Sequence, residues 1–264
     1  MLKISLIIST YNWPEALRAS LASVLMQTQL PDEVSIADDG STSETKNLIE
    51  SLKLEFPIPL VHAWHEDKGF RLSSSRNNAI RKANYDYIII IDGDLLLHKD
   101  FILDHTNSSE KGFYIQGSRV FLNKSLSSQL ISEGSKSMPN IFSSGLSNRK
   151  HLFRSKLLMG ISAAFSKQSH RGTRGCNLAA YKNDLYSVNG FNEEFTSWGR
   201  EDSEFTARLL HSGIKRKNLK FGGIAFHLWH ETSKAKASTE NEKILELTLT
   251  KKLIRCDHGL INIE

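Results

Sequence analysis

The chain has 264 residues, of which 39% are hydrophobic and 24% are charged, and its formal net charge is +5 at pH 7. This length allows one large domain with a buried core, or one domain and a short extension. Two cysteines, Cys176 and Cys256, exclude a disulfide framework, and no apolar run reaches the roughly 20 residues that cross a bilayer.

The first predicted element is a mostly apolar strand at residues 3–10. No basic segment precedes this run and no small-residue cleavage site follows it. We therefore expect a strand rather than a signal peptide, and a cytoplasmic protein. Asn12 is expected to cap the next helix, which has Pro14 in its first turn.

Strands and helices then alternate along the first half of the chain. Further strands are predicted at 33–37, 60–64 and 85–91, and a helix is predicted at 72–83. Such alternation predicts right-handed βαβ units. The expected fold class is therefore α/β, with a mostly parallel central sheet flanked by helices.

The second half of the chain gives weaker signals. Residues 125–147 are rich in serine and predict a long surface excursion that is helical in part. A helix is predicted at 201–210, a strand at 219–226 and a C-terminal helix at 240–253.

Lysine and arginine gather between residues 215 and 255. This clustering indicates either an ordinary solvated basic face or attraction to anionic lipid head groups or to an anionic substrate. No arrangement of basic and aromatic residues typical of nucleic-acid recognition accompanies it, so no nucleic-acid partner is expected.

The run at residues 88–94 carries the strongest chemical signal. Four isoleucines lead directly into Asp92, Gly93 and Asp94. Such a run predicts a central parallel strand buried on both faces, with two carboxylates where it ends. Because an unpartnered buried carboxylate is unfavourable, these aspartates indicate a divalent cation, Mg²⁺ or Mn²⁺. The alternative is a pair of solvated turn aspartates.

Other predicted strand ends and helix starts carry groups that suit a nucleotide. Ser9 and Tyr11 end the first strand, and the tyrosine ring could either stack on a base or cover the sheet edge. Asp39 could accept a hydrogen bond from a base or cap a helix. Arg76 could face a diphosphate or pair with an acid. With the Asp92 region, these groups predict a nucleotide diphosphate bound across the sheet.

The order of these segments resembles the family-2 glycosyltransferases, which have the GT-A fold, a Rossmann-like sandwich. The resemblance implies a nucleotide-sugar, most often a UDP-sugar, and a divalent cation. It also implies that Asp39 bonds the uracil, that Tyr11 stacks on it, that Asp94 ligates the metal, and that Asp92 holds the ribose or a metal-bound water. The matching segments are residues 5–12, 23–28, 37–41, 76–77 and 92–94.

A second resemblance covers the later half of the chain. Residues 175–179, 190–195, 198–205 and 227–230 are similar to the galactosyltransferase-type acceptor half of chondroitin polymerase and β-1,4-galactosyltransferases. Those proteins usually have a second glycine where this chain has Arg200. The substitution puts a bulky cation beside the acid pair, where it could recruit an anionic acceptor.

The second resemblance also implies roles for individual residues. Asp202 would be the catalytic base, Glu201 would orient the acceptor, and Trp198 with Gly199 would line the acceptor site. The alternatives are helix capping for the two acids and core packing for the tryptophan. His227 would be a second protein ligand of the metal, and His230 is the fallback for it; a structural histidine is the alternative.

Together these features predict an inverting, metal-dependent glycosyltransferase. It would move Gal, GalNAc, Glc or GlcNAc from UDP to a hydroxyl of a glycan or lipid-linked glycan in bacterial surface polysaccharide or lipopolysaccharide synthesis. The alternatives are a sugar-phosphate nucleotidyltransferase and a non-catalytic nucleotide- or carbohydrate-binding module.

The same resemblances suggest how the chain is divided. Residues 1–120 would form the nucleotide-sugar-binding half and 121–230 the acceptor half of one catalytic domain, with a helical extension at 231–264. Peripheral contact with the inner face of the cell membrane is an added expectation from the basic C-terminal part.

Overall fold

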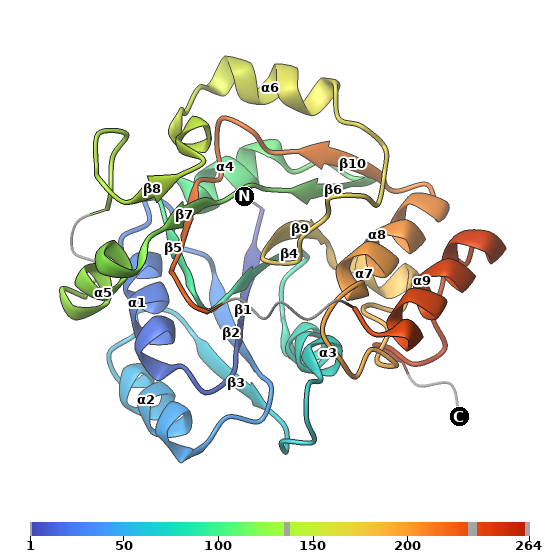
Figure 1. Ribbon diagram of the computed structural model, residues 1–264, viewed down its shortest axis with the longest axis horizontal. Coiled ribbons are helices and arrows are strands. Elements are labelled where there is room, and N and C mark those ends of the chain that lie inside the picture. The colour runs from blue at the N-terminus through green and yellow to red at the C-terminus, as the bar shows by residue number, and fades with distance from the viewer. Residues whose placement is uncertain (1, 135–137, 232–236, 262–264) are drawn as a thin grey trace.

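The computed structural model describes residues 2–134, 138–231 and 237–261. Within these residues the chain forms a seven-stranded sheet with helices on both faces, and a four-stranded sheet beside it (Figure 1). The predicted α/β class with a mostly parallel central sheet is confirmed.

The large sheet consists of β1 (Ile4–Thr10), β2 (Glu33–Asp38), β3 (Leu60–Trp64), β4 (Tyr87–Asp92), β6 (Phe113–Gln116), β9 (Asn177–Tyr181) and β10 (Lys215–Asn218). Its strand order is β10-β6-β9-β4-β1-β2-β3. Neighbours run parallel except at β9, which is antiparallel to both β4 and β6. The carboxyl ends of β1, β2, β4 and β6 therefore lie at one edge of the sheet.

The small sheet has the order β5-β11-β7-β8, and its strands are β5 (Leu95–Leu97), β7 (Val120–Leu122), β8 (Leu146–Ser147) and β11 (Ala225–His227). Gly93 and Asp94 form the corner at which the chain leaves β4 and enters β5. The Gly93 N–H donates to the Ser9 carbonyl at 2.7 Å, and a Cβ on Gly93 would lie 2.8 Å from that oxygen. Glycine therefore lets the corner pack directly against the end of β1.

Helices cover both faces of the large sheet. One face packs against α1 (Pro14–Leu25), α2 (Ser43–Lys53) and α4 (Phe101–Ser108). The other face packs against α3 (Leu72–Lys82), α7 (Lys182–Ser187) and α8 (Glu201–His211). The remaining helices are α5 (Lys124–Ser132), the 3₁₀ turn η1 (Arg149–Leu152), α6 (Lys156–Ala164) and α9 (Thr239–Lys251).

The four isoleucines of β4 show why this strand is apolar throughout. Ile89 and Ile91 pack into the core under α1 and α2, whereas Ile88 and Ile90 pack into the core under α3 and α8. Successive side chains of a strand point to opposite faces, so a strand covered on both sides needs an apolar residue at every position.

Two expectations from the sequence are corrected by the structure. Asn12 does not cap α1; its φ is +45° and its side chain accepts the Thr42 N–H at the start of α2, at 2.9 Å. Residues 219–226 are not one strand, because most of them form the connection between β10 and β11. Residues 125–147 are helical in part, as expected, because they contain most of α5; they also contain the short strand β8.

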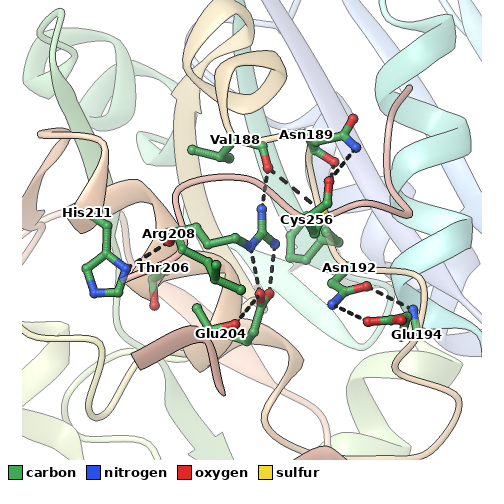
Figure 2. A network of polar contacts seen from close by, with 12 residues as sticks. Val188, Asn189, Asn192, Glu194, Glu204, Thr206, Arg208, His211 and Cys256 are labelled. Carbon is green, nitrogen blue, oxygen red and sulfur yellow. Dashed lines mark hydrogen bonds and ion pairs between the residues drawn. The ribbon is translucent and has the colours of Figure 1, made fainter. Parts of the chain in front are cut away.

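A network of buried polar contacts surrounds α8 and reaches the C-terminal segment, and Figure 2 shows part of it. Arg208 on α8 forms a two-pronged ion pair with Glu204, at 2.7 Å for each bond, and donates to the Val188 carbonyl. The Asn189 amide donates to the Cys256 carbonyl at 2.8 Å. Leu260 is buried in the core beneath α3 and α8.

Candidate active site

Side chains from three strand ends meet at the carboxyl edge of the large sheet. Ser9 on β1 lies opposite Asp92 on β4, and Thr10 lies opposite Asp38 on β2. The N–H of Asp39 donates to the Thr10 carbonyl at 3.0 Å, which brings this aspartate to the same edge. Ligands of open α/β sheets bind at such an edge.

A cavity of about 750 Å³ opens at this edge, between the two sheets. The predicted site residues in its wall are Ser9, Tyr11, Asp39, Asp92, Asp94, Trp198 and His227, and His230, Trp13, Phe70 and Phe121 are among the others. We call this space the donor-side cavity, because it contains most of the residues that the sequence predicts to bind the donor. Residues far apart in the sequence therefore line a single space, with aromatic rings and carboxylates both represented.

Tyr11 and Asp39 line the donor-side cavity, and hydrogen bonds to other residues hold each of them in position. The Tyr11 side chain is half exposed, and its hydroxyl donates to Asp67 at 3.0 Å. Asp39 is buried; it accepts the Arg71 N–H at 2.9 Å and lies 3.0 Å from Nε2 of His65. Burial raises the pKa of Asp39 despite these partners. A ring surface and a hydrogen-bond acceptor are thus fixed on the same wall.

Asp94, His227 and His230 form a compact cluster. Oδ2 of Asp94 lies 3.4 Å from Nε2 of His227 and 3.3 Å from Nε2 of His230. One ligand atom from each residue lies within 4.8 Å of the others. Burial lowers the pKa of His227, which favours the neutral ring that binds metals.

One atom of this cluster lacks a partner. Oδ1 of Asp94 is buried and has no hydrogen-bond partner among the residues that the structure describes. A buried carboxylate oxygen is unfavourable without a donor or a cation. The two imidazoles and this carboxylate therefore fit a divalent cation by position and by chemistry.

Asp92, which was expected among the metal ligands, lies outside this cluster and contacts Arg76 instead. Arg76 is 1% exposed and donates to Asp92 at 3.0 Å, to Asp202 at 2.9 Å and to the Ser9 hydroxyl at 3.3 Å. Burial raises the pKa of Asp92 to about 6, and the Arg76 charge opposes that rise. One guanidinium thus joins the end of β1, the end of β4 and the start of α8.

Glu201 and Asp202 occupy the first turn of α8, after a tight bend in which Gly199 has φ +103° and Arg200 has φ +80°. Oδ2 of Asp202 accepts the Gly175 N–H at 2.6 Å. A Cβ on Gly175 would lie 2.3 Å from Oδ1 of Asp202, so this contact requires glycine. Asp202 is held on one side by Gly175 and on the other by the guanidinium of α3.

Glu201 has a different environment from its neighbour. Its side chain is 6% exposed, and Oε2 has no hydrogen-bond partner within the described residues. Burial, and next the charge of Asp202, raise the pKa of Glu201 to about 7. The pair thus combines one firmly bonded carboxylate with one poised to change its protonation near neutral pH.

A second cavity of about 570 Å³ lies beside these acids. We call it the acceptor-side cavity, because its wall includes Gly199 and Glu201, which the sequence predicts to contact the acceptor. Arg76, Arg174, Arg200 and Asp202 also line it. Arg200 pairs with Glu242 of α9 at 2.8 Å. Four residues line both cavities, namely Leu72, Asp92, Arg119 and Trp198. The two spaces therefore meet around Asp92 and the half-exposed Trp198.

Arg119 is a site residue that the sequence reasoning missed. It lies between β6 and β7 and lines both cavities. Its guanidinium donates to Sγ of Cys176 at 2.8 Å and lies 5.0 Å from the centre of the Phe121 ring. The signal that could have found it is its position three residues after the carboxyl end of a strand parallel to β4.

Comparison with protein families gives two matches. Residues 5–164, more than half of the chain, match the model of glycosyl transferase family 2. Residues 155–231 match the model described as the N-terminal domain of galactosyltransferase. These spans agree with the two segments in which resemblances were found in the sequence.

Individual relatives agree with the family models. The chain is 27% identical over 240 residues to a chondroitin synthase of Escherichia coli, a match covering 85% of this chain and 34% of that protein. It is also 27% identical over 248 residues to a hyaluronan synthase of Pasteurella multocida, covering 85% and 24% respectively. The chain thus spans about a third or less of these curated relatives.

Solved structures share the fold. TarS residues 1–349 of S. aureus in complex with UDP-GlcNAc superpose with a TM-score of 0.65 at 16% identity, covering 98% of this chain and 68% of that one. The mannosyltransferase PcManGT of Pyrobaculum calidifontis, in complex with GDP-Man and Mn²⁺, gives 0.59 at 15% identity, covering 94% and 69%. The predicted GT-A fold is therefore confirmed. The chain belongs to glycosyl transferase family 2.

Proposed function

We propose that this chain transfers a hexose or N-acetylhexosamine from a UDP-sugar to a hydroxyl of a glycan acceptor, with inversion and with the help of Mn²⁺ or Mg²⁺. The observation that carries the proposal is the junction of the two cavities around Asp92 and Trp198. A donor in one cavity and an acceptor in the other would meet beside Asp202, and proximity of this kind accelerates transfer.

The donor-side cavity offers a contact for each part of UDP. The Tyr11 ring would stack on the uracil, and Asp39, fixed by His65 and Arg71, would accept a hydrogen bond from it. Ser9 and Asp92 line the same wall, where they would contact the ribose. The TarS structure with UDP-GlcNAc supports a UDP-sugar as the donor class.

Asp94, His227 and His230 would hold the divalent cation, because they supply one oxygen and two nitrogens in a compact cluster with an unpartnered oxygen. Such a cation, when bound, would neutralise charge that grows on the leaving diphosphate. Arg76 adds a fixed positive charge nearby. Its hydrogen bonds to three acceptors support a role mainly in holding Asp92 and Asp202 in place.

Asp202 would remove the proton from the attacking acceptor hydroxyl, because it is fixed in the wall of the acceptor-side cavity by Arg76 and the Gly175 N–H, and the same guanidinium holds Asp92 at the junction. Glu201 would orient the acceptor by a hydrogen bond, and Trp198 would provide a flat apolar plate for a sugar ring. A single displacement from the face opposite the leaving group inverts the anomeric centre, so an α-linked donor would give a β-linked product.

The acceptor and location belong to the same proposal. We propose a glycan or lipid-linked glycan acceptor in the synthesis of a bacterial surface polysaccharide or lipopolysaccharide, with the chain on the cytoplasmic side, in peripheral contact with the membrane. No helix among the described residues is long and apolar enough to span a bilayer.

The test is UDP release from a panel of UDP-sugars, with Mn²⁺, Mg²⁺ or chelator, and with and without oligosaccharide acceptors. We expect one donor to give metal-dependent release that an acceptor accelerates. Binding of UDP without any release across the panel would favour the non-catalytic module instead. Analysis of the product linkage by NMR tests inversion separately.

A further inference from the structure

The helix α6 presents an apolar face to solvent. Leu157, Ile161 and Phe165 recur every fourth residue along the helix and its C-cap, and their side chains are 74%, 47% and 86% exposed. Phe153, just before the helix, is 53% exposed. The outward face of a surface helix is normally polar, so this stripe requires an explanation.

The opposite face of α6 is firmly anchored, so the stripe is not exposed by loose packing. Met159 is buried in the core. The Ser162 hydroxyl donates to the carbonyls of Asn218 and Lys220 at 3.3 and 3.4 Å, and the Ser155 N–H donates to the Phe221 carbonyl at 2.9 Å. Figure 1 shows α6 along the outer edge of the molecule, beyond β10 and β6.

Positive charge surrounds this stripe. Residues 134–183 contain no aspartate and no glutamate. Lys156, Lys167 and Lys220 are exposed next to α6, and none of the three forms an ion pair within the part of the chain that the structure describes. Arg154, by contrast, is neutralised by Asp104 at 2.7 Å and by Asp100 at 3.3 Å. Among the described residues, these three lysines therefore have no acidic partner that neutralises their charge.

We propose that this α6 surface, made of Phe153, Leu157, Ile161 and Phe165 with Lys156, Lys167 and Lys220, docks onto an anionic lipid bilayer. Helices with an apolar face and flanking lysines lie in the membrane interface, where the apolar side chains enter the acyl boundary and the lysines contact head groups. Symmetric pairing with a second copy is disfavoured, because it would place lysines of one copy against lysines of the other.

The inference deepens the peripheral membrane contact in the proposed function by naming the surface and the lipid class. Vesicle binding is measured without donor, acceptor or transfer. Failure of the α6 surface to bind lipid would therefore leave the enzymatic proposal intact, and loss of transfer would leave the binding result intact.

The experiment measures co-sedimentation of the purified full chain with vesicles of phosphatidylcholine, alone or mixed with phosphatidylglycerol. We expect binding to the mixed vesicles that weakens with added salt. The triple variant Leu157→Ser/Ile161→Ser/Phe165→Ser should bind at least about tenfold more weakly, since it removes the inserted face. The variant Lys156→Glu/Lys167→Glu should lose roughly fivefold or more per lysine.

Matched controls come from α9, which also has an exposed leucine and a terminal lysine. Leu247→Ser and Lys251→Glu should keep the wild-type vesicle binding, and thermal unfolding should show that all variants are folded. UDP release with a soluble acceptor should be unchanged in the triple variant.

Three outcomes would overturn the inference. The first is no binding of the folded wild-type chain to mixed vesicles at low salt. The second is equal binding of the triple variant and the wild type. The third is concentration-dependent self-association of the wild type, measured by light scattering, that the triple variant abolishes while vesicles have no effect; this would assign the surface to a second copy of the chain.

Discussion

Among the side chains of the candidate site, Arg76 holds the most groups in position. It is one buried cation between two carboxylates, Asp92 and Asp202, and both line the acceptor-side cavity. Removing one partner of a buried ion pair leaves an uncompensated charge and is strongly destabilising. The residues that would do the chemistry are therefore also part of what stabilises the site, and variants must be judged on binding and stability as well as on rate.

Asp202→Asn separates these effects. The amide can still accept one hydrogen bond, but it cannot satisfy Arg76 and Gly175 together as the carboxylate does. Because Asp92 still compensates the Arg76 charge in this variant, we expect only a modest loss of stability, about 1–2 kcal/mol. UDP binding should stay intact, and transfer should fall by about 10²–10⁴-fold because the base is gone. Calorimetric UDP binding and product formation measure the two properties, with Ser203→Ala as the neighbouring control. Unchanged turnover would remove Asp202 from the role of base.

Glu201 makes stability depend on pH in a defined direction. Its carboxyl has a pKa of about 7 when folded and an ordinary value near 4.5 when unfolded. Between these values the folded state binds more protons, so stability falls as pH rises through this window. Glu201→Gln removes the titrating group. The stability of the variant relative to wild type should therefore be greater at pH 8 than at pH 4, by on the order of 3 kcal/mol.

Urea unfolding of both proteins across pH 4–8 tests this. The useful quantity is the difference in unfolding free energy between variant and wild type at each pH, because other titrating groups cancel in it. A difference that stays constant over this range would show that Glu201 titrates normally and is not held in an unfavourable buried position.

The helix α9 braces the bend that carries Trp198. Asn241, 2% exposed, donates to the carbonyls of Ser197 at 2.9 Å and Gly199 at 2.7 Å. Further along α9, the Thr248 hydroxyl donates to Glu204 at 3.1 Å and thereby joins the buried ion pair in Figure 2. The C-terminal segment is thus tied both to the start of α8 and to its middle.

Asn241→Ala should therefore loosen the acceptor-side wall without touching the donor side. Two partly buried carbonyls lose their donor, so we expect a loss of about 1–3 kcal/mol in stability. The KM for acceptor should rise severalfold while the KM for UDP-sugar stays near wild type. Leu247→Ala, on the exposed face of the same helix, is the matched control. A parallel rise in both KM values would indicate general loosening of the fold instead.

The sequence predicted best those elements whose signal is local. The β4 run and the alternation of strands and helices through α3 were recovered to within one or two residues, because a strand buried on both faces and a regular βαβ pattern are visible in composition. The 219–226 strand failed for a physical reason. Its apolar residues, such as Leu219 and Ile224, are buried by the meeting of two sheets rather than by pairing within one strand.

The candidate site was also predictable in part, where its residues carry a local signal in the sequence. Acids at strand ends could be located, and Asp39, Asp94 and Asp202 do line the two cavities. What the sequence could not show is which groups face each other. Asp92 pairs with Arg76 because α3 packs on the large sheet, whereas His230 lies beside Asp94 because the segment after β11 returns to the corner at Gly93.

That corner also determines how ligands couple to the stability of the complete fold. The donor-side cavity is lined by β1 and β4 of the large sheet and by β11 of the small sheet. The Leu228 N–H donates to the Asp94 carbonyl at 2.9 Å, which fixes the end of β11 against the corner. A ligand that contacts Asp94 and His227 together should stabilise both sheets at once, because it binds only when they are assembled.

UDP with Mn²⁺, at about 100 times its dissociation constant, should therefore raise the unfolding free energy of the wild type by about 2.7 kcal/mol. Asp94→Ala and His227→Ala should lose the part of this gain that depends on Mn²⁺. His230→Ala tests whether His230 is the third ligand. We expect this variant to bind Mn²⁺ more weakly than the wild type, since Nε2 of His230 lies 3.3 Å from Oδ2 of Asp94. Denaturant titrations with UDP alone, Mn²⁺ alone and both together measure each contribution. The contrary outcome is that His230→Ala binds Mn²⁺ as tightly as the wild type while Asp92→Asn binds it more weakly. The metal would then be held by Asp92 and Asp94, and His230 would not be a ligand.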